Sequence, residues 1–274
     1  MTPTTASKRP SKRAYLLITG FALLLVLFPF LFWYETWFGR KLSDAEITEY
    51  LNNAAAKPRK AQHALVQIGE HLAHGDLRAR QWYPQIAAVS TNPSLELRQT
   101  VAWIMGQDHS YEPFHATLLK LLADPAPMVR RNAALSLTNF GDAAGHSELM
   151  AMLRPYSITA TTSGHIRYRL KTGEYVNPGT LVGHVGDSEV RSPLPGEVLV
   201  LDHKDGAVVG AGDTLAELSP DKEHAWEALR GLLRVGQKQD LEDVERYARG
   251  VAGMPDRVRQ QATLTLQEIQ SRAQ

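Results

Sequence analysis

The pattern of hydrophobic and polar positions divides the chain into an apolar N-terminal segment, two helical blocks and a strand-rich block between them. The apolar segment, residues 14–38, begins with a run that carries no charge, AYLLITGFALLLVLFPFLFWY from Ala14 to Tyr34. At about 1.5 Å per residue, a helix of this length covers roughly the 30 Å of a bilayer's hydrocarbon core. The pattern therefore predicts one transmembrane helix at residues 14–38.

The residues before this run predict the orientation of the helix. Residues 1–13 form a basic tail, which we expect to be cytoplasmic because basic flanks stay on that side of the membrane. The expected location is the inner (cytoplasmic) membrane, with a single pass, a cytoplasmic N-terminus and a periplasmic or extracytoplasmic C-terminal body. A cleaved signal peptide is the alternative, but the run is longer than a usual signal sequence and no Ala-x-Ala site follows it. The basic residues of the tail are Lys8, Arg9, Lys12 and Arg13.

Residues 43–155 and 220–274 have the spacing of short amphipathic helices. Ser43 followed by Glu46 is a capping box that opens the first helix. The segments NPSLELRQTVAWIMG, from Asn92, and DPAPMVRRNAALSLT, from Asp124, align residue for residue. A third copy, PDRVRQQATLTL, begins at Pro255. The same position of the three copies holds an arginine, and we expect each to brace neighbouring turns rather than bind a ligand: Arg98, Arg130 and Arg259.

This pattern resembles HEAT repeats, in which pairs of helices stack side by side. Each pair has an apolar face that it cannot bury alone, so the resemblance implies a HEAT-like array that curves and binds other proteins. A simple orthogonal helix bundle without a groove is the alternative.

The block at residues 156–219 alternates with the period of a half-buried strand. In HIRYRLK, the positions of Ile166, Tyr168 and Leu170 predict one face that packs on a core. The block also repeats internally, since SGHIRYRLKTGEYVNPGTLVGHV is echoed by PGEVLVLDHKDGAVVGAGDTLAEL. We expect a positive φ at the corresponding glycines: 164, 173 and 179 in the first half and 196, 206 and 212 in the second.

These two half-motifs resemble the biotinyl/lipoyl-like barrel-sandwich hybrid domain of carrier proteins and periplasmic adaptors. The resemblance implies an all-β domain inserted into the all-α HEAT-like array. Carriers hold their prosthetic group on a lysine at the tip between the halves, whereas Gly186 to Val190 reads GDSEV here. We therefore expect no covalent biotin or lipoate and no other cofactor. The long helical hairpin of the adaptors has no room at this tip either.

Two sets of residues in this domain are candidates for docking or partner binding. Leu199 and Leu201 should point away from Val198 and Val200, which predicts a second apolar face that the flanking helices cover. The other set is a basic stripe suited to phosphate or acidic partners, although exposed strand faces are commonly charged: His165, Arg167, Arg169 and Lys171.

Composition and motifs limit the kinds of binding and catalysis that we expect of this protein. The formal net charge is +1, and the basic tail accounts for it, so nucleic acid is not an expected partner. There is no cysteine. No recognisable catalytic motif is present, so we expect no enzyme activity and name no catalytic residue. His71 and His74 are a weak metal candidate because a zinc site needs further ligands, and solvated histidines at a helix end are the better interpretation.

These features together predict a membrane-anchored extracytoplasmic scaffold or adaptor that organises a membrane complex, for example a transport or export system. Its partners would be other membrane or periplasmic proteins, and the pattern leaves an oligomer open. Two alternatives remain: an accessory subunit of a membrane enzyme complex, and a sensor that binds a ligand or metal non-covalently where the helices meet the β domain.

Overall fold

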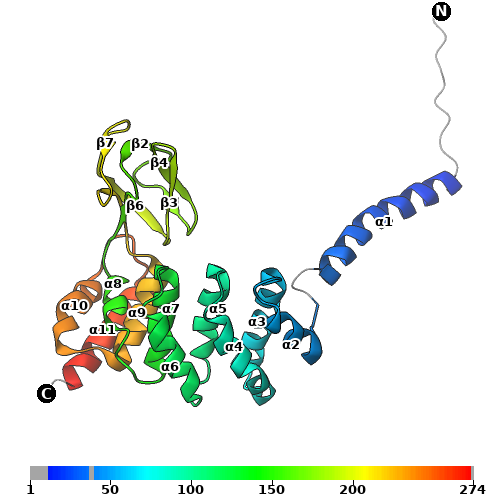
Figure 1. Ribbon diagram of the computed structural model, residues 1–274, viewed down its shortest axis with the longest axis horizontal. Helices are drawn as coiled ribbons and strands as arrows, with labels where there is room; N and C mark the ends of the chain where they lie inside the picture. The colour runs from blue at the N-terminus through cyan, green and yellow to red at the C-terminus, as the bar shows by residue number, and fades with distance from the viewer. Residues whose placement is uncertain (1–11, 37–39, 273–274) are drawn as a thin grey trace, which may run out of the picture. The chain divides into compact units, whose positions relative to one another are not determined.

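The computed structural model describes residues 12–36 and 40–272 (Figure 1). The chain divides into two compact units, Met1–Ile47 and Thr48–Gln274. The second unit contains nearly all of the helical array and the whole β domain.

The first unit contains a helix where the sequence predicted one, α1 (Lys12–Thr36), but the predicted membrane span is wrong. Within the described helices, none sustains apolar side chains over the length that a bilayer core requires. The prediction of a single-pass inner-membrane protein rested on this span and is wrong with it. Residues 1–11, most of the basic tail, lie outside the described residues.

The predicted capping box is confirmed at α2 (Asp44–Asn52). The Glu46 backbone N–H donates to Ser43 Oγ at 3.3 Å, and the Ser43 N–H donates to Glu46 Oε2 at 2.9 Å. The carboxylate and hydroxyl thereby satisfy two backbone donors that the start of a helix leaves unpaired.

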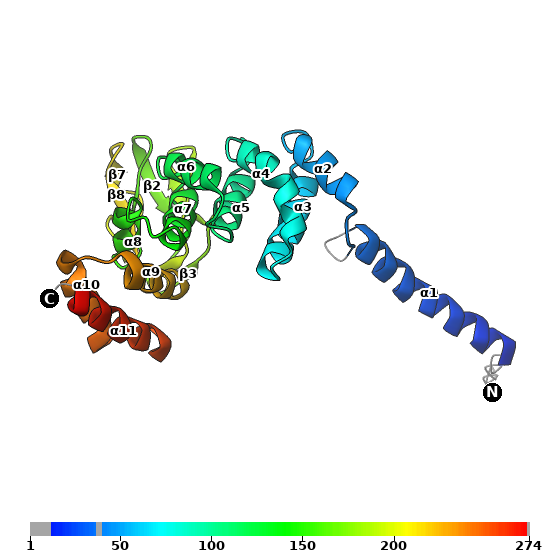
Figure 2. The ribbon, with the colours of Figure 1, turned by 90° about the horizontal axis from the view of Figure 1, so that it is seen from below.

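The helices form two layers (Figures 1 and 2). An inner row packs in the order α3, α5, α7, α9, α11, while α4, α6, α8 and α10 pack against members of this row. Small residues allow the close approach, since a Cβ on Gly106 would lie 2.4 Å from Ser136 Oγ. The elements are α3 (Pro58–Ala73), η1 (Leu77–Trp82), α4 (Tyr83–Val89), α5 (Leu95–Met105), α6 (Glu112–Leu121), α7 (Pro127–Asn139), α8 (His146–Ala151), α9 (Lys222–Val235), η2 (Lys238–Asp240), α10 (Leu241–Arg249) and α11 (Asp256–Arg272).

The β domain lies between α8 and α9 in the sequence and consists of two antiparallel four-stranded sheets, β1-β8-β6-β3 and β5-β4-β2-β7. Both sheets contribute to one apolar core, which includes Ile166, Val182, Val198 and Leu218. The strands are β1 (Tyr156–Thr159), β2 (Gly164–Tyr168), β3 (Tyr175–Val176), β4 (Leu181–Val185), β5 (Ser188–Arg191), β6 (Gly196–Leu201), β7 (Val208–Val209) and β8 (Thr214–Leu218).

The two halves of this domain exchange strands, because β3 pairs with β6 and β7 pairs with β2. The predicted positive φ is wrong for Gly164 and Gly196, which begin β2 and β6. Lack of space requires glycine there instead: a Cβ would lie 3.0 Å from the Gly186 nitrogen in the first case and 2.6 Å from the Ser219 carbonyl oxygen in the second. The prediction is confirmed at the turns, with φ of 88° at Gly173, 85° at Gly179, 84° at Gly206 and 93° at Gly212.

The insertion does not interrupt the helical array. The strand that enters the β domain, β1, pairs with the strand that leaves it, β8, and Tyr156 lies opposite Leu218. The chain therefore returns close to where it departed. As a result α7 and α8 both pack against α9, although the whole β domain separates them from α9 in the sequence.

Candidate functional site

Arg98 joins one repeat to the next through a largely buried ion pair. Its Nε and Nη2 donate to the two carboxylate oxygens of Asp124 at 2.7 and 3.1 Å. Its Nη1 donates to the carbonyls of Asn92 at 2.9 Å and Pro93 at 3.1 Å. Burial alone would raise the pKa of Asp124, but the hydrogen bonds from Arg98 and the Ala126 N–H hold it below its ordinary value.

Arg130 makes the equivalent contacts one repeat later. Its Nη1 donates to the carbonyls of Asp124 and Pro125, and its Nε donates to Glu148 Oε1 at 2.5 Å. Arg259 differs, because its ion pair is with Asp256 of its own helix, at 3.1 Å, and both side chains are exposed. Arg98 and Arg130 thus contact neighbouring segments of the array, whereas the ion pair of Arg259 lies within one helix, and the bracing role stays a prediction.

A second set of cross-repeat contacts was not predicted. Aspartates that follow α5, α7 and α9 accept hydrogen bonds from the first or second turn of α4, α6 and α8, which we call the outer helices. The separation of Tyr83 from His115 equals that of Asn92 from Asp124, so the repeat alignment contained the signal. The contacts are Tyr83 Oη to Asp108 Oδ2 at 2.8 Å, His115 Nε2 with Asp142 Oδ2 at 2.6 Å and His146 Nε2 with Asp240 at 2.8 Å.

Inner helices are also tied by side chains that donate to the carbonyls of a neighbouring helix. On α7 the donors are spaced i, i+4 and i+7, which places them on one face. These bonds satisfy polar groups within the packed layer. They run from Asn132 to the Gln99 carbonyl (3.0 Å), from Ser136 to that of Ala102 (2.7 Å) and from Asn139 to that of Gly106 (3.0 Å).

The candidate metal pair lies at the end of α3. His71 Nδ1 is 3.1 Å from Asp76 Oδ2, and His74 Nδ1 is 2.7 Å from the Glu70 carbonyl oxygen. Across the described ranges, no group of three or more potential metal ligands gathers around these or other histidines. Within the part of the chain that the structure describes, the two histidines therefore lack the further ligands that a zinc site needs.

A polar cluster, in which Asp221 and Arg131 are buried and Tyr175 is exposed, connects the β domain to the array. The phenol of Tyr175, in β3, donates to Asp221 Oδ2 at 2.7 Å, while Asp221 Oδ1 accepts the backbone N–H of His224 at 3.0 Å and thereby caps α9. Arg131 of α7 is only 5% exposed, and its Nη1 lies 3.1 Å from His224 Nδ1. Burial lowers the pKa of Arg131 to about 10. Burial and the nearby Arg131 also lower the pKa of His224.

The apolar docking candidates are arranged differently from the prediction. Leu199 is 40% exposed and Val200 is 43% exposed, so the predicted covering of Leu199 by the flanking helices is wrong. Leu201 instead packs against the core of the β domain. The pairing of β6 with β8 shifts between Val198 and Val200, and such a bulge turns the following residues to the opposite face. The predicted shared face of Leu199 and Leu201 is therefore wrong.

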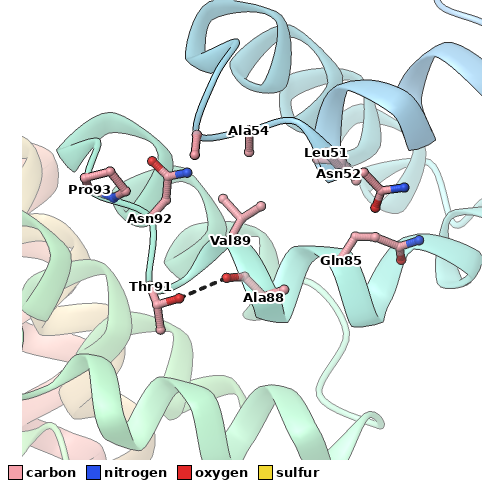
Figure 3. A pocket seen from close by; sticks show the side chains of 10 residues that line it. Leu51, Asn52, Ala54, Gln85, Ala88, Val89, Thr91, Asn92 and Pro93 are labelled. Carbon is pink, nitrogen blue, oxygen red and sulfur yellow. Dashed lines mark hydrogen bonds between the residues drawn. The ribbon is translucent and has the colours of Figure 1, made fainter.

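A pocket of about 370 Å³ lies where the end of α2 faces α4 (Figure 3). Its lining contains no charged side chain. Amide side chains at Asn52, Gln85 and Asn92 accompany small apolar ones, so the pocket suits an uncharged group that can also form hydrogen bonds. The lining residues are Leu51, Asn52, Ala54, Ala55, Gln85, Ala88, Val89, Thr91, Asn92 and Pro93.

One comparison with known proteins gives a match. The family model for the HEAT repeat matches residues 116–144, which comprise part of α6, all of α7 and the loop that follows. This match supports the predicted HEAT-like character of the helical part. HEAT repeats in general mediate protein–protein interaction. No curated protein matches the chain.

Proposed function

We propose that this protein is an interaction scaffold in which the HEAT-like array and the inserted β domain present two binding surfaces held in a fixed relation. The observation that carries the proposal is the packing of α7 and α8 against α9 across the insertion. A continuous array holds the β domain by both of its ends, and the bond from Tyr175 to Asp221 adds a side-chain contact at the junction. A domain that presents a binding surface at a fixed position needs such rigid attachment. A carrier domain that moves between active sites needs a flexible linker instead.

We also propose that the β domain is of the biotinyl/lipoyl-like type, used without a prosthetic group. The two interlocked halves and their matched glycine turns support this assignment. The turn between β4 and β5 is Gly186–Asp187, and it offers no amine for attachment. The intact mass of the protein should equal that of the unmodified chain, and an added biotinyl or lipoyl mass would overturn this assignment.

The pocket between α2 and α4 gives a direct test of the scaffold proposal. Ala55 lines the pocket and is exposed, whereas the adjacent Ala56 is exposed but is not part of the lining. The variant Ala55→Trp should fill the pocket without disturbing the core, and Ala56→Trp is the matched control. We expect proteins cross-linked to the wild type in cells to be retained by Ala56→Trp and lost from Ala55→Trp. Identical capture by both variants would remove the array pocket from the proposal.

A second experiment tests whether the array and the β domain are held in a fixed relation. Tyr175→Phe removes the hydroxyl that donates to Asp221 while keeping the ring. We expect faster hydrogen exchange at residues 219–224 and weaker capture of any partner that cross-links to both the array and the β domain. If every captured partner cross-links to only one of the two, the proposed joint presentation is wrong.

A further inference from the structure

The outward face of the sheet β5-β4-β2-β7 gathers arginine and histidine side chains from three strands. On β2, Ile166 is fully buried, while His165 and Arg167 are exposed on the opposite face. Arg169 is exposed just beyond the strand, and its N–H donates to the Val182 carbonyl at 2.8 Å, which continues the pairing with β4. The predicted stripe along β2 is thus one column of a wider surface.

The strand register adds residues that the sequence did not bring together. Arg167 lies opposite His184 of β4, and His184 lies opposite Glu189 of β5. Arg191, two residues further along β5, is on the same face as Glu189 because side chains alternate. We name this surface the basic face and define it as His165, Arg167, Arg169, His184 and Arg191.

The basic face has little internal compensation for its charge. Arg191 pairs with Glu189 at 2.8 Å. The Arg167 guanidinium instead donates to the Gly186 carbonyl at 3.0 Å, and His165 Nδ1 is 3.0 Å from the Gly206 carbonyl oxygen. Among the ion pairs of the described residues, none includes Arg167 or Arg169. A guanidinium that donates to a carbonyl still has N–H groups that can donate to both oxygens of a carboxylate.

The other sheet carries the opposite charge. Glu197 of β6 lies opposite Tyr175, and Glu217 of β8 lies opposite Ser157, with both carboxylates on the outward side because their neighbours Val198 and Leu218 are in the core. The outward side of this sheet therefore carries carboxylates where the basic face carries arginines. The chain beyond its N-terminal tail is slightly acidic, so the basic face does not merely reflect a protein that is basic overall.

We propose that the basic face docks an acidic segment of a partner protein, whose carboxylates pair with Arg167 and Arg169. The complementary charge selects glutamate and aspartate side chains, and a row of basic residues that crosses neighbouring strands suits an extended polypeptide. Glu189 within the face disfavours the uninterrupted phosphates of a nucleic acid. This inference rests on the scaffold function proposed above and specifies the chemistry of one of its two surfaces.

The test uses the full chain and a short fluorescent peptide rich in glutamate, with fluorescence anisotropy as the readout. Arg167→Glu with Arg169→Glu reverses the face. Lys120→Glu with Lys238→Glu makes the same change in net charge at exposed positions on α6 and η2. We expect the first double variant to bind the peptide about ten-fold more weakly and the second to bind like the wild type. Binding should also weaken as salt rises from about 50 to about 300 mM.

Several results would overturn the inference. They are equal binding by both double variants, equal binding of a peptide with glutamine in place of glutamate, and tighter binding of a single-stranded oligonucleotide. Light scattering that shows self-association lost on reversal of the face would assign it to a second copy instead. Arg167→Gln with Arg169→Gln, checked for hydrogen exchange in β2, distinguishes lost charge from lost folding. If peptide binding fails while the Ala55→Trp effect on partner capture remains, only this inference fails and the scaffold proposal stands.

Discussion

The helical array and the β domain are held together by different means. In the array, polar side chains reach from one repeat to the next, as when Arg98 binds Asp124 and Ser136 donates to the Ala102 carbonyl. In the β domain, the two halves are joined by the backbone pairings that exchange β3 and β7, to which side-chain contacts such as that of Tyr168 with the Leu215 carbonyl are added. The array should therefore be sensitive to loss of individual charged side chains, whereas the β domain should be sensitive to changes in backbone geometry.

The largest expected effect is the loss of a bracing arginine. Arg98→Ala leaves the Asp124 carboxylate, whose side chain is 5% exposed, without its main partner. We expect the free energy of unfolding to fall by about 3 kcal/mol, as for other broken buried pairs. Arg259→Ala is the matched control, since its exposed i, i+3 pair with Asp256 should contribute no more than about 0.5 kcal/mol. Urea denaturation measures both, and equal losses would contradict the assigned difference between the two arginines.

A backbone change should affect the β domain alone. Gly206 has φ of 84°, and a Cβ placed there meets nothing within 4 Å, so Gly206→Ala introduces strain without a clash. We expect a cost of about 1 to 3 kcal/mol. Hydrogen exchange should accelerate across residues 156–218 and remain unchanged in α3 to α7. Matching acceleration in those helices would mean that the two regions unfold as one.

The bulge in β6 gives a smaller contrast within one strand. Leu201 packs on the core of the β domain, whereas Leu199 is 40% exposed. Leu201→Ser should cost about 1 to 2 kcal/mol of unfolding free energy, and Leu199→Ser less than about 0.5 kcal/mol. Thermal unfolding of the two variants compares them directly. A larger loss for Leu199→Ser would place that side chain against a surface that the structure does not show.

The smallest expected effect is a pH dependence. The hydrogen bond to Asp142 raises the pKa of His115 in the folded state. The contribution of this contact to the free energy of unfolding is therefore fully present below the unfolded pKa of His115, about 6.5. It is lost as pH rises through the raised pKa of the folded state. The His115→Gln variant should lose this gain, which comparison of denaturation midpoints at pH about 5.5 and about 8.5 would reveal. His224, whose pKa is lowered, acts with the opposite sign, so its contribution is lost as pH falls below about 6.5.

The sequence predicted the features that depend on neighbours close in the chain. The Ser43–Glu46 capping box, the repeat position shared by Arg98 and Arg130, and the glycine turns each involve local geometry or fixed spacing. The length of α1 was also evident, but its predicted role in the membrane was wrong.

The remaining errors and omissions depend on contacts between distant segments. The reversal at Leu201 follows from how β6 pairs with β8, which alternation along β6 alone does not reveal. The contact of Arg131 with His224 crosses the inserted domain, so no helical periodicity predicts it. Likewise, His184 and Arg191 join the basic face through register with neighbouring strands.

The position of the insertion has a consequence for synthesis of the chain on the ribosome. Roughly 70 residues separate the end of α8 from the start of α9, and they take about 4 to 14 s to emerge at ordinary rates of translation. During this interval α7 and α8 are without the helix that covers them in the finished molecule. Folding of the β domain places β1 beside β8 and so positions the nascent α9 next to α7 and α8. The β domain would thereby act as a timing element, and slow folding of its strands would prolong the exposure of an apolar face to aggregation.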